Sequence, residues 1–144
     1  MKASVVTPNY NGKKFLKTYF DSLNRNKDSV GEVILVDNGS TDGSIEFIKD
    51  YSKNLDFPVI MIRNVENLGF AKAVNQGILK SNYDYIFSLN NDTEVEKGAV
   101  KSLMDLISSD EDIFSVASKM VKFDNKTLID DAGDEYNILA WTKK

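Results

Sequence analysis

Short apolar runs alternate along the chain with stretches in which apolar residues recur every three or four positions. The runs are short enough for buried strands, and they cover residues 3–6, 33–36, 59–62 and 85–89. The stretches have helical spacing, and they cover residues 15–23, 45–55, 70–78 and 100–107. A further strand is predicted over 114–123, with loop or short strands after it.

Strands that alternate with helices predict a parallel sheet covered by helices on both faces. The run 33–36 is apolar at every position, which is typical of a buried parallel strand. No internal repeat, low-complexity tract or linker interrupts the pattern. We therefore predict a doubly wound α/β fold and a single domain over residues 1–144.

Composition removes several classes of chemistry. The chain has no cysteine and no histidine, which excludes disulfides, thiolate nucleophiles, imidazole bases and the usual zinc sites. Its net charge is −4 and it has no basic run, which argues against a nucleic-acid partner. An acidic protein that binds an anionic ligand needs a metal, helix N-termini or local cations. No signal peptide or membrane-length apolar stretch is present, so we expect a cytoplasmic protein.

Each predicted strand is followed by a segment of small, amide-bearing or acidic residues. The four segments are residues 7–12, 37–43, 63–69 and 90–93. In open parallel sheets, ligands bind outside the carboxyl ends of the strands. One such segment would indicate a turn, whereas four that converge on one edge of the sheet predict a polar ligand.

Particular side chains in these segments suit a nucleotide. Tyr10 offers a flat face on which a base can stack, and Asp37 can accept a hydrogen bond from an imide N–H. Gly69 lets the backbone approach an anion closely, and Lys72 lies where a cation could reach a phosphate. Asp92 is the kind of hard oxygen ligand that holds Mg²⁺ or Mn²⁺ against phosphate oxygens.

Some of these residues also have ordinary structural explanations. Tyr10 could pack at the rim of the core, and Asn67 could only shape a turn. Asn75 and Lys72 could be solvated side chains on a helix, and Asp42 is expected to be a helix cap rather than a ligand contact. Asp37 and Asp92 are better explained by a ligand than by a turn, since an unpaired carboxylate at the end of a buried strand is costly.

The motifs themselves resemble those of the family 2 glycosyltransferases. They are TPNYNG at 7–12, VDNGSTD at 36–42, NxGxxxAxNxG at 67–77 and LNNDT at 89–93, in the order and spacing of that family. The resemblance covers nearly the whole chain. It implies the Rossmann-like GT-A fold, in truncated form, and a nucleotide-sugar donor.

The resemblance also implies the residues of the donor site. Those around the nucleotide would be Thr7, Pro8, Tyr10, Asn11, Asp37, Asn38, Asn67, Gly69, Lys72, Asn75 and Asn91. A divalent metal, Mg²⁺ or Mn²⁺, would be held by Asp92 and Asn90, where the family has an Asp-x-Asp motif. The first position of this motif is Asn here, which leaves Asp92 as its only charged ligand.

The function implied is inverting transfer of a sugar from a UDP- or dTDP-linked donor to an acceptor hydroxyl. A glycan or lipid-linked acceptor is expected, in polysaccharide or cell-envelope glycan synthesis, with the full-length protein at the inner membrane face. The family places its catalytic base well beyond the metal motif, so we expect the base beyond Lys144. The chain would then be a donor-binding part that transfers sugar poorly, and its truncated face could self-associate through Leu139 and Trp141.

Two other functions would leave different features in the sequence. A non-catalytic nucleotide-binding module would bind nucleotide without needing Asp92 or a metal. A dehydrogenase or phosphoryl-transfer protein would carry a GxGxxG or GxxxxGK[ST] motif, and the sequence contains neither after its first strand.

Overall fold

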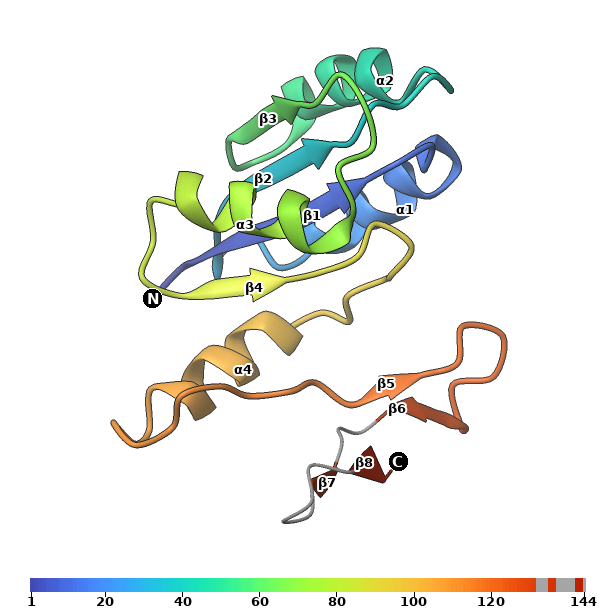
Figure 1. Ribbon diagram of the computed structural model, residues 1–144. Coiled ribbons are helices and arrows are strands. Elements are labelled where there is room, and N and C mark those ends of the chain that lie inside the picture. Colours follow the sequence, from blue (N-terminus) through green and yellow to red (C-terminus); the bar gives the residue numbers. More distant parts are fainter. Residues whose placement is uncertain (132–134, 137–141, 144) are drawn as a thin grey trace. The chain divides into compact units, whose positions relative to one another are not determined.

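The computed structural model describes residues 1–131, 135–136 and 142–143 (Figure 1). The chain falls into two compact units, Met1–Met104 and Asp105–Lys144. The single domain expected over 1–144 remains a prediction. Leu139 and Trp141, the expected self-association residues, lie outside the described positions.

The first unit is an α/β structure built on a four-stranded parallel sheet in the order β3-β2-β1-β4. Its strands are β1 (Ala3–Asn9), β2 (Val30–Asp37), β3 (Val59–Arg63) and β4 (Ile86–Ser88). Its helices are α1 (Lys13–Asn24), α2 (Ser44–Tyr51), the 3₁₀ turn η1 (Ser52–Asn54), α3 (Phe70–Lys80) and α4 (Ala99–Ile107), which extends just past the boundary between the units. The predicted α/β class and parallel sheet are confirmed.

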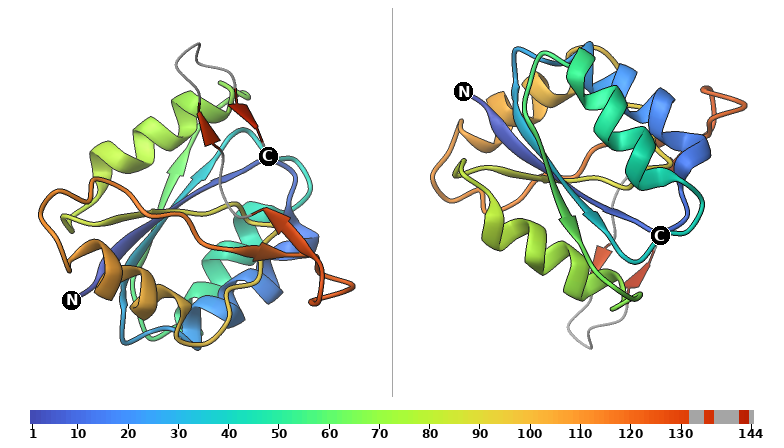
Figure 2. Two further views of the ribbon diagram at one scale, coloured as in Figure 1. Left: turned by 90° about the horizontal axis from the view of Figure 1, so that it is seen from below. Right: turned by 90° about the horizontal axis from the view of Figure 1, so that it is seen from above.

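Helices cover both faces of the sheet, with α3 on one face and α1 and α2 on the other (Figure 2). Successive strand residues point to opposite faces, so the core divides in two. Val5 of β1 packs in the cluster that contains Leu16 of α1. Its neighbour Val6 packs instead with Ala73 of α3.

Helix α3 approaches the sheet closely at Gly77. A Cβ atom added at this glycine would lie 2.4 Å from Cγ1 of Val6, which is fully buried in β1. The glycine therefore allows a close approach of helix and strand that a larger residue would prevent.

Glu32 is a buried carboxylate within β2, on the strand residue that pairs with Ser4 of β1. Its Oε1 accepts hydrogen bonds from Ser4 Oγ (2.6 Å) and Asn82 N (2.7 Å), and its Oε2 accepts one from Asn82 Nδ2 (2.8 Å). Burial by itself raises the pKa of Glu32, but these hydrogen bonds together outweigh it and hold the pKa below its usual value. The carboxylate thus ties β2 to β1 and to the segment that leads into β4.

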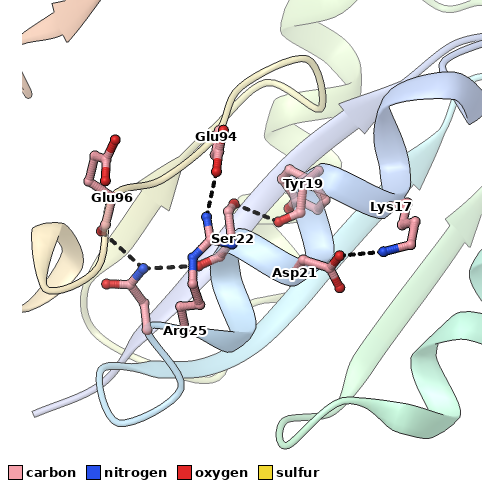
Figure 3. A network of polar contacts seen from close by, with 8 residues as sticks. Lys17, Tyr19, Asp21, Ser22, Arg25, Glu94 and Glu96 are labelled. Carbon is pink, nitrogen blue, oxygen red and sulfur yellow. Dashed lines mark hydrogen bonds and ion pairs between the residues drawn. The ribbon is translucent and has the colours of Figure 1, made fainter. Parts of the chain in front are cut away.

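The end of α1 holds the segment between β4 and α4 (Figure 3). Arg25 forms an ion pair of 2.6 Å with Glu94. Asn26 is buried, and its Nδ2 donates to the carbonyl oxygens of Ser22 (3.0 Å) and Glu96 (3.1 Å). Its Oδ1 accepts a hydrogen bond from Gly98 N at 2.8 Å. The residues that follow Asp92 are therefore fixed on α1.

Asp42 links the first turns of two helices. Its Oδ1 accepts a hydrogen bond from Ser44 N, at the start of α2, at 3.0 Å, and its Oδ2 accepts one from Lys13 N, at the start of α1, at 2.9 Å. The N-cap position of α2 is itself Gly43, at φ +83°. Asp42 therefore accepts a hydrogen bond from the first turn of α2, as a capping residue would, although it precedes the N-cap residue by one position.

The second unit contains short antiparallel pairs. Strand β5 (Met120–Val121) pairs with β6 (Ile129–Asp131), and β7 (Glu135–Tyr136) pairs with β8 (Thr142–Lys143). The long strand predicted over 114–123 is wrong, because only residues 120–121 are in a strand. The apolar run suggested burial, yet Phe114 is 96% exposed and residues 114–119 pair with no strand.

No helix in the parts of the chain described is long and apolar enough to cross a membrane.

Candidate functional site

A cavity of about 270 Å³ lies at the carboxyl ends of the parallel strands. The register places Asn9, Asp37 and Arg63 side by side where β1, β2 and β3 end. The loops that follow the strands supply the walls, which are residues 8–10, Asn38, Asn67, Phe70 and residues 90–92. The segments singled out in the sequence therefore meet at one edge of the sheet.

Asp37 is buried at the end of β2 and does not line this cavity. Its side chain is fully buried, with Oδ2 accepting a hydrogen bond from Asn9 Nδ2 at 2.8 Å and Oδ1 accepting one from Ser40 N at 2.9 Å. These N–H groups compensate for the burial of the charge. The base contact expected of Asp37 stays a prediction, and the observed role of its carboxylate is to join β2 to β1 and to the loop after β2.

The charge of Asp37 also sets the orientation of two amides. A carboxylate only accepts hydrogen bonds, so Asn9 must turn its Nδ2 toward Asp37 and its Oδ1 away. That Oδ1 accepts a hydrogen bond from Asn91 Nδ2 at 2.5 Å. The chain from Asp37 through Asn9 therefore leaves Asn91 Oδ1 as the unused end of the Asn91 amide, at the wall of the cavity.

Residues 90–92 present oxygen atoms next to one another. Asp92 is exposed, and its carboxylate makes no hydrogen bond or ion pair with any described residue. The turn is held by Thr93, whose Oγ1 donates to the carbonyl oxygen of Asn90 at 2.7 Å. The carboxylate of Asp92 and the amide oxygens of Asn90 and Asn91 are thus available to a ligand at this end of the cavity.

This donor set fits a divalent cation bound together with a phosphate ligand. Mg²⁺ is usually held by one or two carboxylates, with the remaining positions filled by water and substrate phosphates. Asp92 supplies one carboxylate, and amide oxygens are suitable hard ligands beside it. Within the described residues no cluster of three or more His, Cys, Asp or Glu side chains forms a cage for a metal. The ligand would therefore have to complete the coordination.

At the other end of the cavity, amides hold the loop between β3 and α3. Asn38 Nδ2 donates to Asn67 Oδ1 at 2.8 Å, and Asn38 Oδ1 accepts from Asn64 Nδ2 at 3.0 Å and from Leu68 N at 3.1 Å. Asn64 and Gln76 exchange two further amide hydrogen bonds, of 2.8 and 3.0 Å. This network ties the loop both to β2 and to α3, so the wall that it forms is well supported.

Two aromatic rings line the cavity and are largely open to solvent. Tyr10 is 54% exposed and Phe70 is 60% exposed. Neither ring contacts another aromatic ring in the described part of the chain. The site therefore combines flat apolar surfaces with the acidic, amide-rich segment at 90–92.

Several of the residues expected at the site do not line the cavity. Thr7 is buried, and its Oγ1 makes a hydrogen bond of 2.5 Å with the Tyr19 hydroxyl. Asn11 holds the loop after β2, since its Oδ1 accepts from Thr41 N at 2.9 Å. The remaining ones, Gly69, Lys72 and Asn75, lie at or beyond the start of α3 and are exposed. Their expected ligand contacts stay predictions.

Sequence reasoning missed two residues that line the cavity, Asn9 and Phe70. Asn9 was passed over as one more amide in a loop, although it is the last residue of β1 and only 1% exposed. Phe70 was counted as part of the apolar face of a helix. Its position directly after Gly69, as the first residue of the helix, was the available signal that it lies beside the loop.

Comparisons with known proteins agree with this geometry. The model of the family described as Glycosyl transferase family 2 matches residues 4–142. The chain is 38% identical over 101 residues to the uncharacterized glycosyltransferase YfnE of Bacillus subtilis, a match that covers 69% of this chain and 25% of that protein. It is 32% identical over 117 residues to the abequosyltransferase RfbV of Salmonella typhimurium, covering 79% of this chain and 35% of that protein. The chain thus spans about a quarter to a third of these relatives.

Solved structures show the same fold. Residues 1–349 of TarS from Staphylococcus aureus, in complex with UDP, align with a TM-score of 0.67 and 23% identity, covering 85% of this chain and 40% of that one. The mannosyltransferase PcManGT from Pyrobaculum calidifontis, in complex with GDP-Man and Mn²⁺, aligns with a TM-score of 0.69 and 18% identity. That alignment covers 75% of this chain and 32% of the mannosyltransferase. The predicted GT-A fold is confirmed.

Proposed function

Because the chain belongs to the family 2 glycosyltransferases, we propose that it is the donor-binding part of an inverting glycosyltransferase. The donor is a nucleoside diphosphate sugar, UDP- or dTDP-linked. The observation that carries the proposal is the cavity itself, which has exposed aromatic rings at Tyr10 and Phe70 and an available carboxylate at Asp92. These are the groups needed for a stacked base and for a metal-bound diphosphate.

The order of the strands supports one direction for the donor. Tyr10 follows β1 and Asp92 follows β4, the strand next to β1 at the edge of the described sheet. The base would stack on Tyr10, and the diphosphate would extend toward residues 90–92. A divalent ion held by Asp92, with Asn90 and Asn91 beside it, supplies positive charge that stabilises the leaving diphosphate.

Inversion requires the acceptor hydroxyl to attack from the face opposite the diphosphate while a base removes its proton. Among the described residues Asp92 is the only carboxylate that lines the cavity, and as a metal ligand it would not be free to act as that base. In keeping with the family resemblance, we propose that the base lies well beyond the segment at 90–92. Without it, transfer would be slower by on the order of 10²–10⁴-fold, so the isolated chain should bind donor yet transfer sugar poorly.

The wider function is proposed from the relatives. An abequosyltransferase and a poly-beta-1,6-N-acetyl-D-glucosamine synthase of Staphylococcus aureus, 41% identical over 68 residues, support a role in polysaccharide or cell-envelope glycan synthesis. A glycan or lipid-linked acceptor fits that role. We place the reaction in the cytoplasm, with the full-length protein peripheral at the inner membrane face, where a lipid-linked acceptor would be found.

Thermal unfolding with UDP or dTDP, each with and without Mn²⁺, tests donor binding. A ligand at about 100 times its Kd stabilises the folded state by roughly 2.7 kcal/mol, which for a domain of this size raises Tm by roughly 5–15 °C. The metal-dependent part of the shift should disappear in Asp92→Ala. A shift that is the same without Mn²⁺ and in Asp92→Ala would favour a non-catalytic nucleotide-binding module, and no shift with any nucleotide would refute the proposal.

A further inference from the structure

Phe70 is an unusually exposed aromatic residue for the first position of a helix that packs on a sheet. Its side chain is 60% exposed, although the helix buries Ala73 and Gly77 one and two turns later. The ring lies at the wall of the cavity and contacts no other aromatic ring among the described residues. Packing of α3 on the sheet therefore does not explain this side chain.

Phe70 and Tyr10 line the same cavity, although they come from different parts of the chain. Tyr10 follows β1 and Phe70 follows β3, while β2, which lies between these strands, contributes Asn38 to the same cavity. The two rings and Asn38 therefore line one cavity, and Asp92, which follows β4, lines it as well.

Among the described residues, one unused hydrogen-bond donor lines the same cavity as these rings. Leu68 N donates to Asn38 Oδ1, and Gly69 N donates to Asn67 Oδ1 at 2.9 Å. A backbone N–H can only donate, so these two bonds fix which end of each amide is oxygen. Asn67 Nδ2 is then left without a partner among the described residues, on a side chain that lines the cavity.

We propose that Phe70 is a second stacking surface for the base of the donor, opposite Tyr10, and that Asn67 Nδ2 donates a hydrogen bond to a carbonyl oxygen of that base. This inference rests on the proposed donor-binding function and assigns it a residue that sequence reasoning missed. A planar base with ring carbonyls, such as uracil or thymine, suits two ring faces and one N–H donor. The diphosphate would extend toward Asp92, the carboxylate proposed to hold the metal.

The test compares Phe70→Ala with the unchanged chain in titration calorimetry with UDP and, separately, with inorganic diphosphate, both in the presence of Mn²⁺. Loss of a base–aromatic stack should weaken UDP binding by about 5- to 150-fold. Binding of diphosphate should stay within about twofold, because it has no base. Phe70→Trp should keep UDP binding within a fewfold of the unchanged chain, since it keeps a flat ring.

Leu79→Ala is the matched control. Leu79 is on the same helix and 88% exposed, but it does not line the cavity, so its removal should change neither affinity. Asn67→Asp, which replaces the donor with an acceptor, should weaken UDP binding and spare diphosphate binding.

The outcomes separate this inference from the function on which it rests. If Phe70→Ala binds UDP as well as the unchanged chain does, or loses UDP and diphosphate equally, the stacking role is refuted while donor binding stands. If the unchanged chain binds no nucleotide at all, both the inference and the proposed function are refuted.

Discussion

Exchanging the side chains of the buried pair Asp37 and Asn9 tests whether the site is held as the structure shows. The Asp37 carboxylate accepts one N–H from Asn9 at 2.8 Å and one from Ser40 at 2.9 Å. In Asp37→Asn only one oxygen remains, so with Asn9 in its present orientation one of these two donors faces an NH₂ group. The variant keeps the size and shape of the side chain, so the loss reports on the charge and hydrogen bonds of Asp37 rather than on packing.

The magnitude follows from the burial of both residues, which are 0% and 1% exposed. A buried donor left without an acceptor costs about 1–3 kcal/mol. Asp37→Asn should therefore lower the free energy of unfolding by about that amount. Asn9→Asp should cost at least as much, because it places a second carboxylate against the first in a buried position.

The double variant, with Asp37→Asn and Asn9→Asp together, should recover most of this loss. The amide introduced at position 37 can donate to the carboxylate introduced at position 9, and its oxygen still accepts from Ser40 N. The new carboxylate accepts from Asn91 Nδ2, as the oxygen of Asn9 does now. Only the hydrogen bond from Asn9 Nδ2 to Ser40 Oγ (3.1 Å) has no direct counterpart, so the recovery should be large but incomplete.

Urea unfolding followed by circular dichroism would measure all four proteins as a double-mutant cycle. We expect a coupling energy of at least about 1 kcal/mol in favour of the exchanged pair. Simple additivity, with the double variant as unstable as the sum of the two single variants, would contradict the hydrogen-bond assignment and with it the orientation inferred for Asn91.

Three further predictions concern the framework around the site. Gly77→Ala should lower stability in urea unfolding by about 1–3 kcal/mol, because the new Cβ would overlap Val6; a neutral or stabilising effect would contradict the close packing. The folded pKa of Glu32 lies below its unfolded value, so its contribution to stability is present above the unfolded pKa, near pH 4.3, and is lost as the pH falls through the folded pKa. The free energy of unfolding, measured from pH 7 down to pH 3, should thus fall less steeply in Glu32→Gln than in the unchanged chain. An equal slope in the two proteins would contradict the lowered pKa of Glu32. Asn26→Ala should cost about 1–3 kcal/mol and Arg25→Ala less than about 1 kcal/mol, since only the first leaves buried groups without partners; equal costs would refute that distinction.

The fold could be predicted because apolar periodicity carries most of its information. The run at 33–36 is apolar throughout and lies in a strand that is buried along its whole length. Periodicity could not show where β1 ends, because Thr7 and Asn9 are polar and yet buried, and their hydrogen-bond partners come from distant parts of the chain. It also misplaced the strand over 114–123, since an apolar run is a strand only where another strand pairs with it.

The edge of the sheet that holds the site was predictable, but the direction of individual side chains was not. In the structure Asn38 lines the cavity, whereas its neighbour Asp37 is buried and does not line it, so the base contact expected of Asp37 stays a prediction. That outcome depends on Asn9 and Ser40, which together satisfy the carboxylate, and no local pattern in the sequence reveals that arrangement. Phe70 was missed for a related reason, because a helical pattern does not show which apolar residue remains exposed.

The central claim is that the cavity at the carboxyl ends of the parallel strands binds a nucleoside diphosphate and a divalent metal. At 16.2 kDa the chain is small enough for amide-resolved NMR, which can locate both ligands in one titration. We predict that UDP shifts the amide signals of Tyr10, Asn38, Asn67 and Phe70, and that Mn²⁺ added with UDP selectively broadens the signals of residues 90–93. Shifts confined to residues 105–144, or broadening that spares the neighbourhood of Asp92, would contradict the account.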